Sequence, residues 1–360
     1  MTVQTVTVKG GGAGAEQPVS EPVGLAAVSD GATRQRLILD CDPGTDDAVA
    51  IIAAVAHPRL ELVAVTTVNG NQAIEHCTDN ALRVLDSLGS RVPVYAGAAR
   101  PFVRDDMPIP RDILNAGNPE FQVTTLDFPA PVSAPSPGNA VDFLIESFMG
   151  EDAAAGGRVG GADLCLVATG PLTNIALALD AEPRLAARIP RLILMGGAVN
   201  GGNVTASAEF NFWVDADAAK AVLASAIRDI TIVPLDATHS VPLTLEDCAA
   251  FEQAGTPAGQ SIAAVVRHRI LTDGGATGGA APVHDPLCLA YLADPGVVTE
   301  MLHRPVDVEA VGTVTVGELV LDARPWIEDS RGRHTAVCAD HDRFVAFLRE
   351  AVSLPSPPAP

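Results

Sequence analysis

The stretch Asp40-Cys41-Asp42-Pro43-Gly44-Thr45-Asp46-Asp47 places four carboxylates within eight residues. It follows the apolar run Leu37–Leu39 and precedes the apolar run Ala48–Val55, and its Pro-Gly pair favours a tight turn. The pattern predicts a strand that ends on the first two aspartates and a buried helix that begins on the last two. In open parallel sheets, ligands bind at the carboxyl ends of the strands, so we expect the functional site here.

Four like charges in one turn repel one another, and burying them without partners is costly. A positive partner is therefore expected, and an oxygen-rich cluster favours a hard divalent cation such as Ca²⁺ or Mg²⁺. An EF-hand loop is excluded, because an apolar helix replaces its later ligands and closing Glu.

Two other interpretations would give the cluster a different role. The aspartates could be purely structural, as caps and as partners of a helix dipole. The string also resembles the Asp-x-Asp motif of haloacid-dehalogenase-type phosphatases, but Thr45 comes one position too late for that motif.

Composition limits the classes of protein and partner. The chain has 360 residues, of which 48% are hydrophobic and 19% charged, enough for a folded globular core. The net charge of −21 argues against nucleic acid or an anionic membrane as partner. The six cysteines form no CxxC pair, which favours reduced thiols in a cytosolic protein. The sequence shows no signal peptide and no apolar run that could span a bilayer, so we expect a cytoplasmic location.

Apolar β-type runs alternate with helical patterns from residue 36 onward. This alternation predicts an α/β fold with a mostly parallel β-sheet flanked by helices, in a single domain with insertions. We expect a disordered or loosely attached N-terminal extension over 1–33, the folded domain over 34–355 and a C-terminal tail over 356–360. The predicted strands are Leu37–Leu39, Leu62–Val68, Leu164–Ala168, Leu192–Met195 and Ile230–Leu235, with a late hairpin of Val306–Val311 and Thr313–Leu321 at the sheet edge. The predicted helices are Asp47–Ala56, Ala73–Leu88, Asn174–Asp180, Ala216–Ala226 and Pro257–Leu271.

Further polar clusters follow the predicted strands, where an active site at the strand ends would need them. Each has an ordinary explanation as a turn or a helix cap. Together they supply carboxylates, amides and one histidine without a cationic cluster, a set that suits a neutral polyhydroxylated ligand with a metal as the only strong positive charge. The clusters are Asn69–Gln72, Thr169–Asn174, Gly196-Gly197 leading to Asn203 and Ala208–Asn211, and His284–Pro286.

With these clusters in view, the chain resembles the inosine-uridine-preferring nucleoside hydrolase family over roughly residues 36 to 345. The motifs occur in the family's order and at similar spacing. They are Asp40–Ala48, Asn69–Gln72, Thr169–Asn174, Met195–Gly197, Ala208–Trp213 and His284–Pro286. The resemblance implies a Rossmann-like nucleoside hydrolase fold and a Ca²⁺ ion at the strand ends.

The resemblance also implies roles for single residues. The metal ligands would be the carboxylates of Asp42, Asp47 and Asp285 and the main-chain carbonyl of Thr169, with water and the ribose completing the shell. The substrate-binding residues would be Asp46, Asn71 and Asn211 on the 2′- and 3′-hydroxyls, Asn203 and Glu209 on the 5′-hydroxyl, and Met195.

The implied reaction is hydrolysis of the N-glycosidic bond of ribonucleosides to free base and ribose, through an oxocarbenium-like transition state. Asp42 would act as general base on a metal-bound water. His284 would face the base and assist its departure, or would only pack and orient its neighbours. The implied context is purine or pyrimidine salvage by a homodimer or homotetramer. A catalytically weak or silent Ca²⁺-dependent nucleoside-binding homologue is the alternative.

One departure from the family pattern concerns the leaving base. Many family members carry a histidine in the loop after the segment that corresponds to Val94–Gly97. The matching region here, residues 112–118, contains none. The base preference, purine or pyrimidine, therefore stays open.

Overall fold

Eight strands form one sheet in the computed structural model, which describes residues 34–106, 118, 120–150, 163–272, 278–324, 326–327 and 333–353. All of these residues belong to the unit Thr33–Pro360. The strand order is β3-β2-β1-β4-β5-β6-β12-β9, and every neighbouring pair is parallel except β12 and β9. The strands are β1 (Gln35–Cys41), β2 (Leu60–Thr67), β3 (Val94–Ala96), β4 (Leu164–Ala168), β5 (Arg191–Met195), β6 (Ile230–Val233), β9 (Val298–Leu302) and β12 (Arg333–Ala339).

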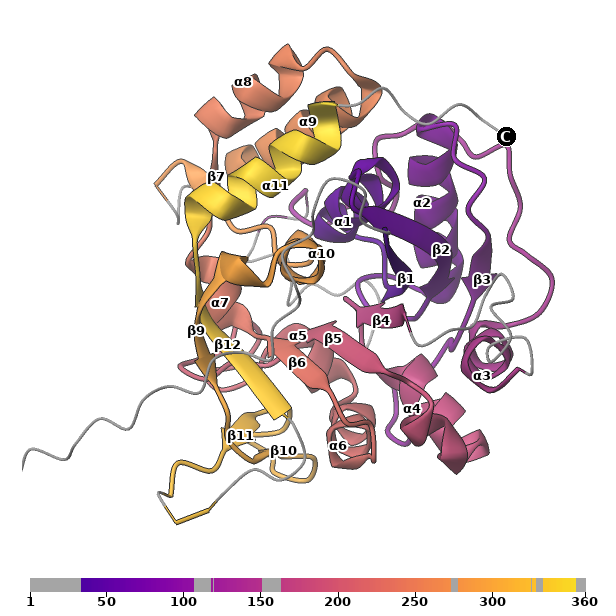
Figure 1. The fold of residues 1–360 in the computed structure, drawn as a ribbon, viewed down its shortest axis with the longest axis vertical. Helices are drawn as coiled ribbons and strands as arrows, with labels where there is room; N and C mark the ends of the chain where they lie inside the picture. The colour runs from indigo at the N-terminus through magenta and orange to yellow at the C-terminus, as the bar shows by residue number, and fades with distance from the viewer. Residues whose placement is uncertain are drawn as a thin grey trace, which may run out of the picture. The chain divides into compact units, whose positions relative to one another are not determined.

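Helices cover both faces of the sheet (Figure 1). Alternate residues of β1 divide between two apolar cores: Leu37 and Leu39 belong to one and Ile38 to the other, because successive strand side chains point to opposite faces. The first core includes residues of α1 (Thr45–Ala56), α2 (Ile74–Ser87), α9 (Pro257–Thr272), α10 (Pro286–Ala293) and α11 (His341–Ser353), and α8 (Leu245–Gln253) packs on α9 and α11. The second core includes residues of α3 (Ala140–Met149), α4 (Thr173–Ala181) and α6 (Ala216–Ala224).

The predicted mostly parallel α/β fold is therefore confirmed. Each of the predicted strands and helices of the main fold is present within a few residues of its expected bounds. The predicted strand Ile230–Leu235 is too long: β6 ends at Val233, and Pro234 caps the short helix α7 (Leu235–His239). Proline ends the strand because it has no N–H to donate to the sheet.

The predicted late hairpin exists, but its placement at the sheet edge is wrong. Its strands, β10 (Val306–Val308) and β11 (Leu319–Leu321), pair with each other in a two-stranded sheet separate from the main one. They pack beside α6, where Lys220 donates to Asp307, and bury Val306 in the second core (Figure 1). In the described residues, the main sheet has β3 at one edge and β9 at the other.

The predicted extension over 1–33 and tail over 356–360 lie outside the described residues. Across the described ranges, no helix combines the length and apolar character needed to cross a membrane.

The strand order reverses between β1 and β4, which lie side by side although β2 and β3 come between them in sequence. Such a switch point opens a crevice at the carboxyl ends of the strands. The aspartate-rich turn follows β1 and Thr169 follows β4, so the fold brings the two predicted clusters together there.

Two glycines at this crevice leave room for the carboxylate of Asp42. A Cβ on Gly70, after β2, would lie 2.0 Å from Asp42 Oδ2, and one on Gly170, after β4, would lie 2.7 Å from Asp42 Oδ1. Non-bonded atoms do not approach so closely, so Asp42 keeps its place only because neither residue has a side chain.

We predict that Gly70→Ala lowers the free energy of unfolding by about 1–3 kcal/mol, because the new methyl group overpacks against Asp42. The loss should be much smaller in an Asp42→Gly background, where the colliding atoms are gone. Urea denaturation of the four proteins measures both values, and an equal loss in the two backgrounds would contradict the packing described here.

Candidate active site

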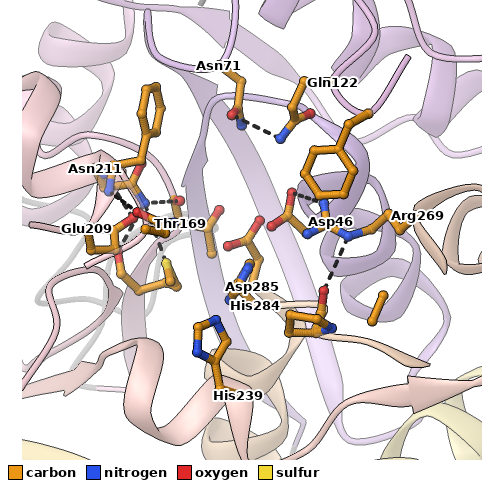
Figure 2. A pocket seen from close by; sticks show the side chains of 16 residues that line it. Asp46, Asn71, Gln122, Thr169, Glu209, Asn211, His239, Arg269, His284 and Asp285 are labelled. Carbon is orange, nitrogen blue, oxygen red and sulfur yellow. Dashed lines mark hydrogen bonds and ion pairs between the residues drawn. The ribbon is translucent and has the colours of Figure 1, made fainter. Parts of the chain in front are cut away.

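A cavity of about 310 Å³ opens at the carboxyl ends of β1, β4 and β5. Most of the predicted site residues line it (Figure 2). They are Asp46, Asn71, Thr169, Met195, Asn203, Glu209, Asn211, His284 and Asp285. Asp42 and Asp47 do not line the cavity: both are fully buried and connect to its lining through Asn71 and Thr169.

Three carboxylates meet beside the cavity, and two of them, Asp46 and Asp285, line it. Asp46, Asp47 and Asp285 each place an oxygen within 4.8 Å of the others, and all three are buried. Asp46 and Asp285 approach one another near the centre of Figure 2. Of the predicted metal ligands, Asp47 and Asp285 thus belong to this trio, Asp46 joins them, and Asp42 lies outside it.

Asp42 is tied to the trio by Asn71. The backbone N–H of Asn71 donates to Asp42 Oδ2 at 2.6 Å, and its side-chain amide donates to Asp47 Oδ2 at 3.3 Å. Thr169 Oγ1 donates to Asp47 Oδ1 at 2.9 Å. Within the described residues, Asp42 Oδ1 is buried without a hydrogen-bond donor, and Asp46 Oδ1 has none either but lies 3.4 Å from Arg269 Nη1. Buried carboxylate oxygens in this state are the groups that a cation would satisfy.

Burial makes the charged form of these acids unfavourable. Burial, and secondarily the charge of Asp47, raises the pKa of Asp42 well above its usual range. Burial and the charge of Asp46 raise the pKa of Asp285 similarly, and that of Asp47 to about 7. A divalent cation would reverse these shifts, since it favours the ionised carboxylates. An all-oxygen donor set suits Ca²⁺ or Mg²⁺.

Asp40, the first acid of the turn, has a different environment. Its Oδ1 accepts hydrogen bonds from Thr66 Oγ1 at 2.6 Å and from the Asn174 amide at 2.7 Å. These bonds join the ends of β1 and β2 to α4, and they offset part of the cost of burial, which raises the pKa of Asp40 to about 6. Asp40 thus has a structural role beneath the site.

The opposite side of the cavity is held by backbone hydrogen bonds. Glu209 caps α5 (Phe210–Val214), because its carboxylate accepts from the backbone N–H groups of Asn211, Phe212 and Gly197. Burial raises the pKa of Glu209 to about 7, although these bonds oppose the shift. The Asn211 amide donates to the carbonyl oxygen of Thr169 at 2.8 Å. That oxygen keeps a second lone pair, so it can still serve as a ligand.

Two histidines lie near the acids, one of them not predicted. His284 Nδ1 is 2.8 Å from Thr238 Oγ1, and the ring of His239 lies 5.5 Å from that of His284 (Figure 2). Burial lowers the pKa of His284 to about 3, so its ring is neutral at pH 7, and burial also lowers the pKa of His239. Thr238 and His239 end α7, the short helix that follows β6, and their place soon after a predicted strand was the one signal in the sequence.

The expectation that a metal would be the only strong positive charge is wrong. Arg269, from the last turn of α9, lines the cavity and is 2% exposed. It forms an ion pair with Asp46 at 3.4 Å. Nothing local in the helical pattern marks this residue, because its partners Thr45 and Asp46 lie more than two hundred residues earlier.

Phe121 and Gln122 also line the cavity and were not predicted. They follow the region of residues 112–118 that lacks a histidine. All of that region except Asn118 lies outside the described residues.

Comparisons with known proteins agree with the fold and the motifs. The family model "Inosine-uridine preferring nucleoside hydrolase" matches residues 37–346. The pyrimidine-specific ribonucleoside hydrolase RihB of Escherichia coli O157:H7 is 34% identical over 326 residues, which cover 89% of this chain and 97% of that protein. Among solved structures, the purine-preferring ribonucleoside hydrolase from Gardnerella vaginalis has a TM-score of 0.77 and 31% identity over 88% of this chain and 98% of its own. The plant nucleoside hydrolase PpNRh1 has a TM-score of 0.75 and 27% identity, and the match covers 89% of this chain and 99% of the plant enzyme's chain. As the resemblance predicted, the chain belongs to the inosine-uridine preferring nucleoside hydrolase family.

Proposed function

We propose that this chain hydrolyses the N-glycosidic bond of ribonucleosides in a Ca²⁺-dependent reaction that releases free base and ribose. The observation that carries the proposal is the group of buried, mutually repelling carboxylates beside a cavity lined by amides and carboxylates. This arrangement needs a cation, and the lining has the hydrogen-bonding groups that sugar hydroxyls require.

The carboxylates of Asp42, Asp47 and Asp285 and the carbonyl of Thr169 would hold the ion. The unpartnered Oδ1 of Asp42 and the free lone pair of the Thr169 carbonyl support this set. When bound, the ion would supply the positive charge that orients the attacking water and the ribose hydroxyls.

Asp42 is the proposed general base. The N–H of Asn71 fixes its Oδ2, which leaves Oδ1 to accept a proton from the attacking water. The ribosyl group develops positive charge as the bond to the base breaks, and the surrounding carboxylates stabilise that charge.

Side chains on both sides of the cavity would hold the sugar. Asp46, Asn71 and Asn211 are proposed for the 2′- and 3′-hydroxyls, and Asn203 and Glu209 for the 5′-hydroxyl. Their support is that all of them line one cavity and that backbone bonds hold Glu209 and Asn211 in place. Met195, at the end of β5, would contact the sugar through its apolar side chain.

The neutral ring of His284 would lie on the side of the departing base and assist its release.

The relatives include a pyrimidine-specific and a purine-preferring enzyme, so the comparisons leave the base preference of this chain open. A homodimeric or homotetrameric assembly and a cytoplasmic location remain predictions from the sequence.

A substrate panel tests the proposal. We expect the chain to release ribose from at least one of uridine, cytidine, inosine and adenosine with Ca²⁺ present, and to stop when a chelator is added. The 2′-deoxynucleoside of the best substrate should react far more slowly, since buried polar groups would lose their partner. Binding of nucleoside without release of ribose would instead identify a silent homologue.

We predict that Asp42→Asn lowers kcat by about 10²–10⁴-fold, the usual contribution of a general base, and leaves the fold intact. Asp40→Asn is the matched control: Asp40 lies two residues away on β1, equally buried, but is bonded to Thr66 and Asn174. That variant should lose stability and keep most of its kcat. Near-normal turnover in Asp42→Asn would remove Asp42 as the base.

We predict that Asp285→Ala abolishes Ca²⁺ binding, because it removes one of the three proposed carboxylate ligands, a buried member of the trio. Isothermal titration calorimetry measures the affinity. Asp247→Ala, at the capping box of α8 and outside the cavity lining, should bind Ca²⁺ like the wild type. Unchanged affinity in Asp285→Ala would contradict the proposed ligand set.

A further inference from the structure

Arg269 is fixed by contacts on several sides of its guanidinium group. Nη1 donates to Thr45 Oγ1 at 2.6 Å and lies 3.4 Å from Asp46 Oδ1, while Nε donates to the Pro282 carbonyl at 3.2 Å. Its Cζ also stands 5.1 Å from the centre of the Phe121 ring. Figure 2 shows the side chain reaching Asp46 from one side of the cavity. A buried guanidinium anchored at three polar groups has little freedom to move.

Asp46 has two possible partners. One of its oxygens lies within 4.8 Å of ligand oxygens of Asp47 and Asp285, so it is close enough to join them on a cation. Its Oδ1 accepts no hydrogen bond and faces Arg269. The side chain also lines the cavity, where it is available to a sugar.

We propose that Arg269 is a positioning residue that holds the carboxylate of Asp46 off the metal ion and keeps it available to the ribose hydroxyls. This inference rests on the proposed function, because it assumes a cation beside Asp47 and Asp285 and a sugar in the cavity. The attraction between Asp46 and a divalent ion is opposed by its ion pair with Arg269, and both interactions are strong in a buried site. As a result, the site binds the metal ion less tightly and the ribonucleoside more tightly than it would without Arg269.

A purely structural role for Arg269 leads to different expectations. If it only joined α9 to the start of α1, its removal would lower stability and weaken metal and substrate binding together. If it only reduced the negative charge of the cavity, its removal would strengthen metal binding whether or not Asp46 carried a carboxylate.

The test is a double-mutant cycle of Arg269→Met and Asp46→Asn, read by calorimetric titration of chelator-treated protein with Ca²⁺. We expect Arg269→Met to tighten Ca²⁺ binding by about tenfold in the wild-type background and by little in Asp46→Asn, which has no carboxylate to recruit. The KM for the best ribonucleoside should rise about tenfold in Arg269→Met, since Asp46 would turn from the sugar to the ion.

Arg269→Lys keeps the positive charge, so its Ca²⁺ affinity and its KM should both lie close to those of the wild type. Arg191→Met removes a partly exposed ion pair with Asp229 away from the cavity and should change neither value. If Arg269→Met does not fold, Arg269→Gln keeps a hydrogen-bond donor without the charge and should give the same pattern.

Equal tightening in both backgrounds, weaker Ca²⁺ binding or an unchanged KM would each overturn the inference. The proposed function fails separately, if wild-type protein with Ca²⁺ releases no ribose from any ribonucleoside.

Discussion

Like charges buried together at the ends of two parallel strands are the constraint on which this structure depends. Asp42, Asp47 and Asp285 are each less favourable as anions because of burial, and each is further disfavoured by its acidic neighbours. Hydrogen bonds from Asn71 and Thr169 offset only part of that cost. A cation could offset the rest, since these buried acids form a group that could hold a metal ion.

The fold brings the acids together from distant parts of the chain. The reversal of strand order between β1 and β4 sets the aspartate turn beside Thr169. The start of α10 adds Asp285, and α9 adds Arg269. Glycines at 70 and 170 let neighbouring loops approach Asp42 more closely than a side chain would allow. The active site is therefore a consequence of sheet topology as much as of any one motif.

Local sequence was sufficient for the parts of the site that depend on local structure. An apolar run, a Pro-Gly turn and a second apolar run predicted β1 and α1, because strand and helix periodicity decide such elements. What sequence could not supply were relations between distant segments. Asp40 looks like its neighbours in sequence, yet Thr66 and Asn174 give it a structural role. Arg269 lies in a helix with no unusual pattern. The late hairpin packs on α6 because its apolar residues are buried in the second core there.

The central claim is that the buried acids exist to hold a cation, and proton-linked Ca²⁺ binding tests it most directly. In the metal-free protein their raised pKa values keep some of these carboxyls protonated near pH 6, with that of Asp47 about 7. An ion that takes them as ligands must displace those protons. Calorimetric titration at pH 6 in buffers of different ionisation enthalpy should show one Ca²⁺ per chain and release of about one proton or more, and the number of protons released should fall as the pH rises. Binding without proton release at pH 6, or no binding, would contradict the account.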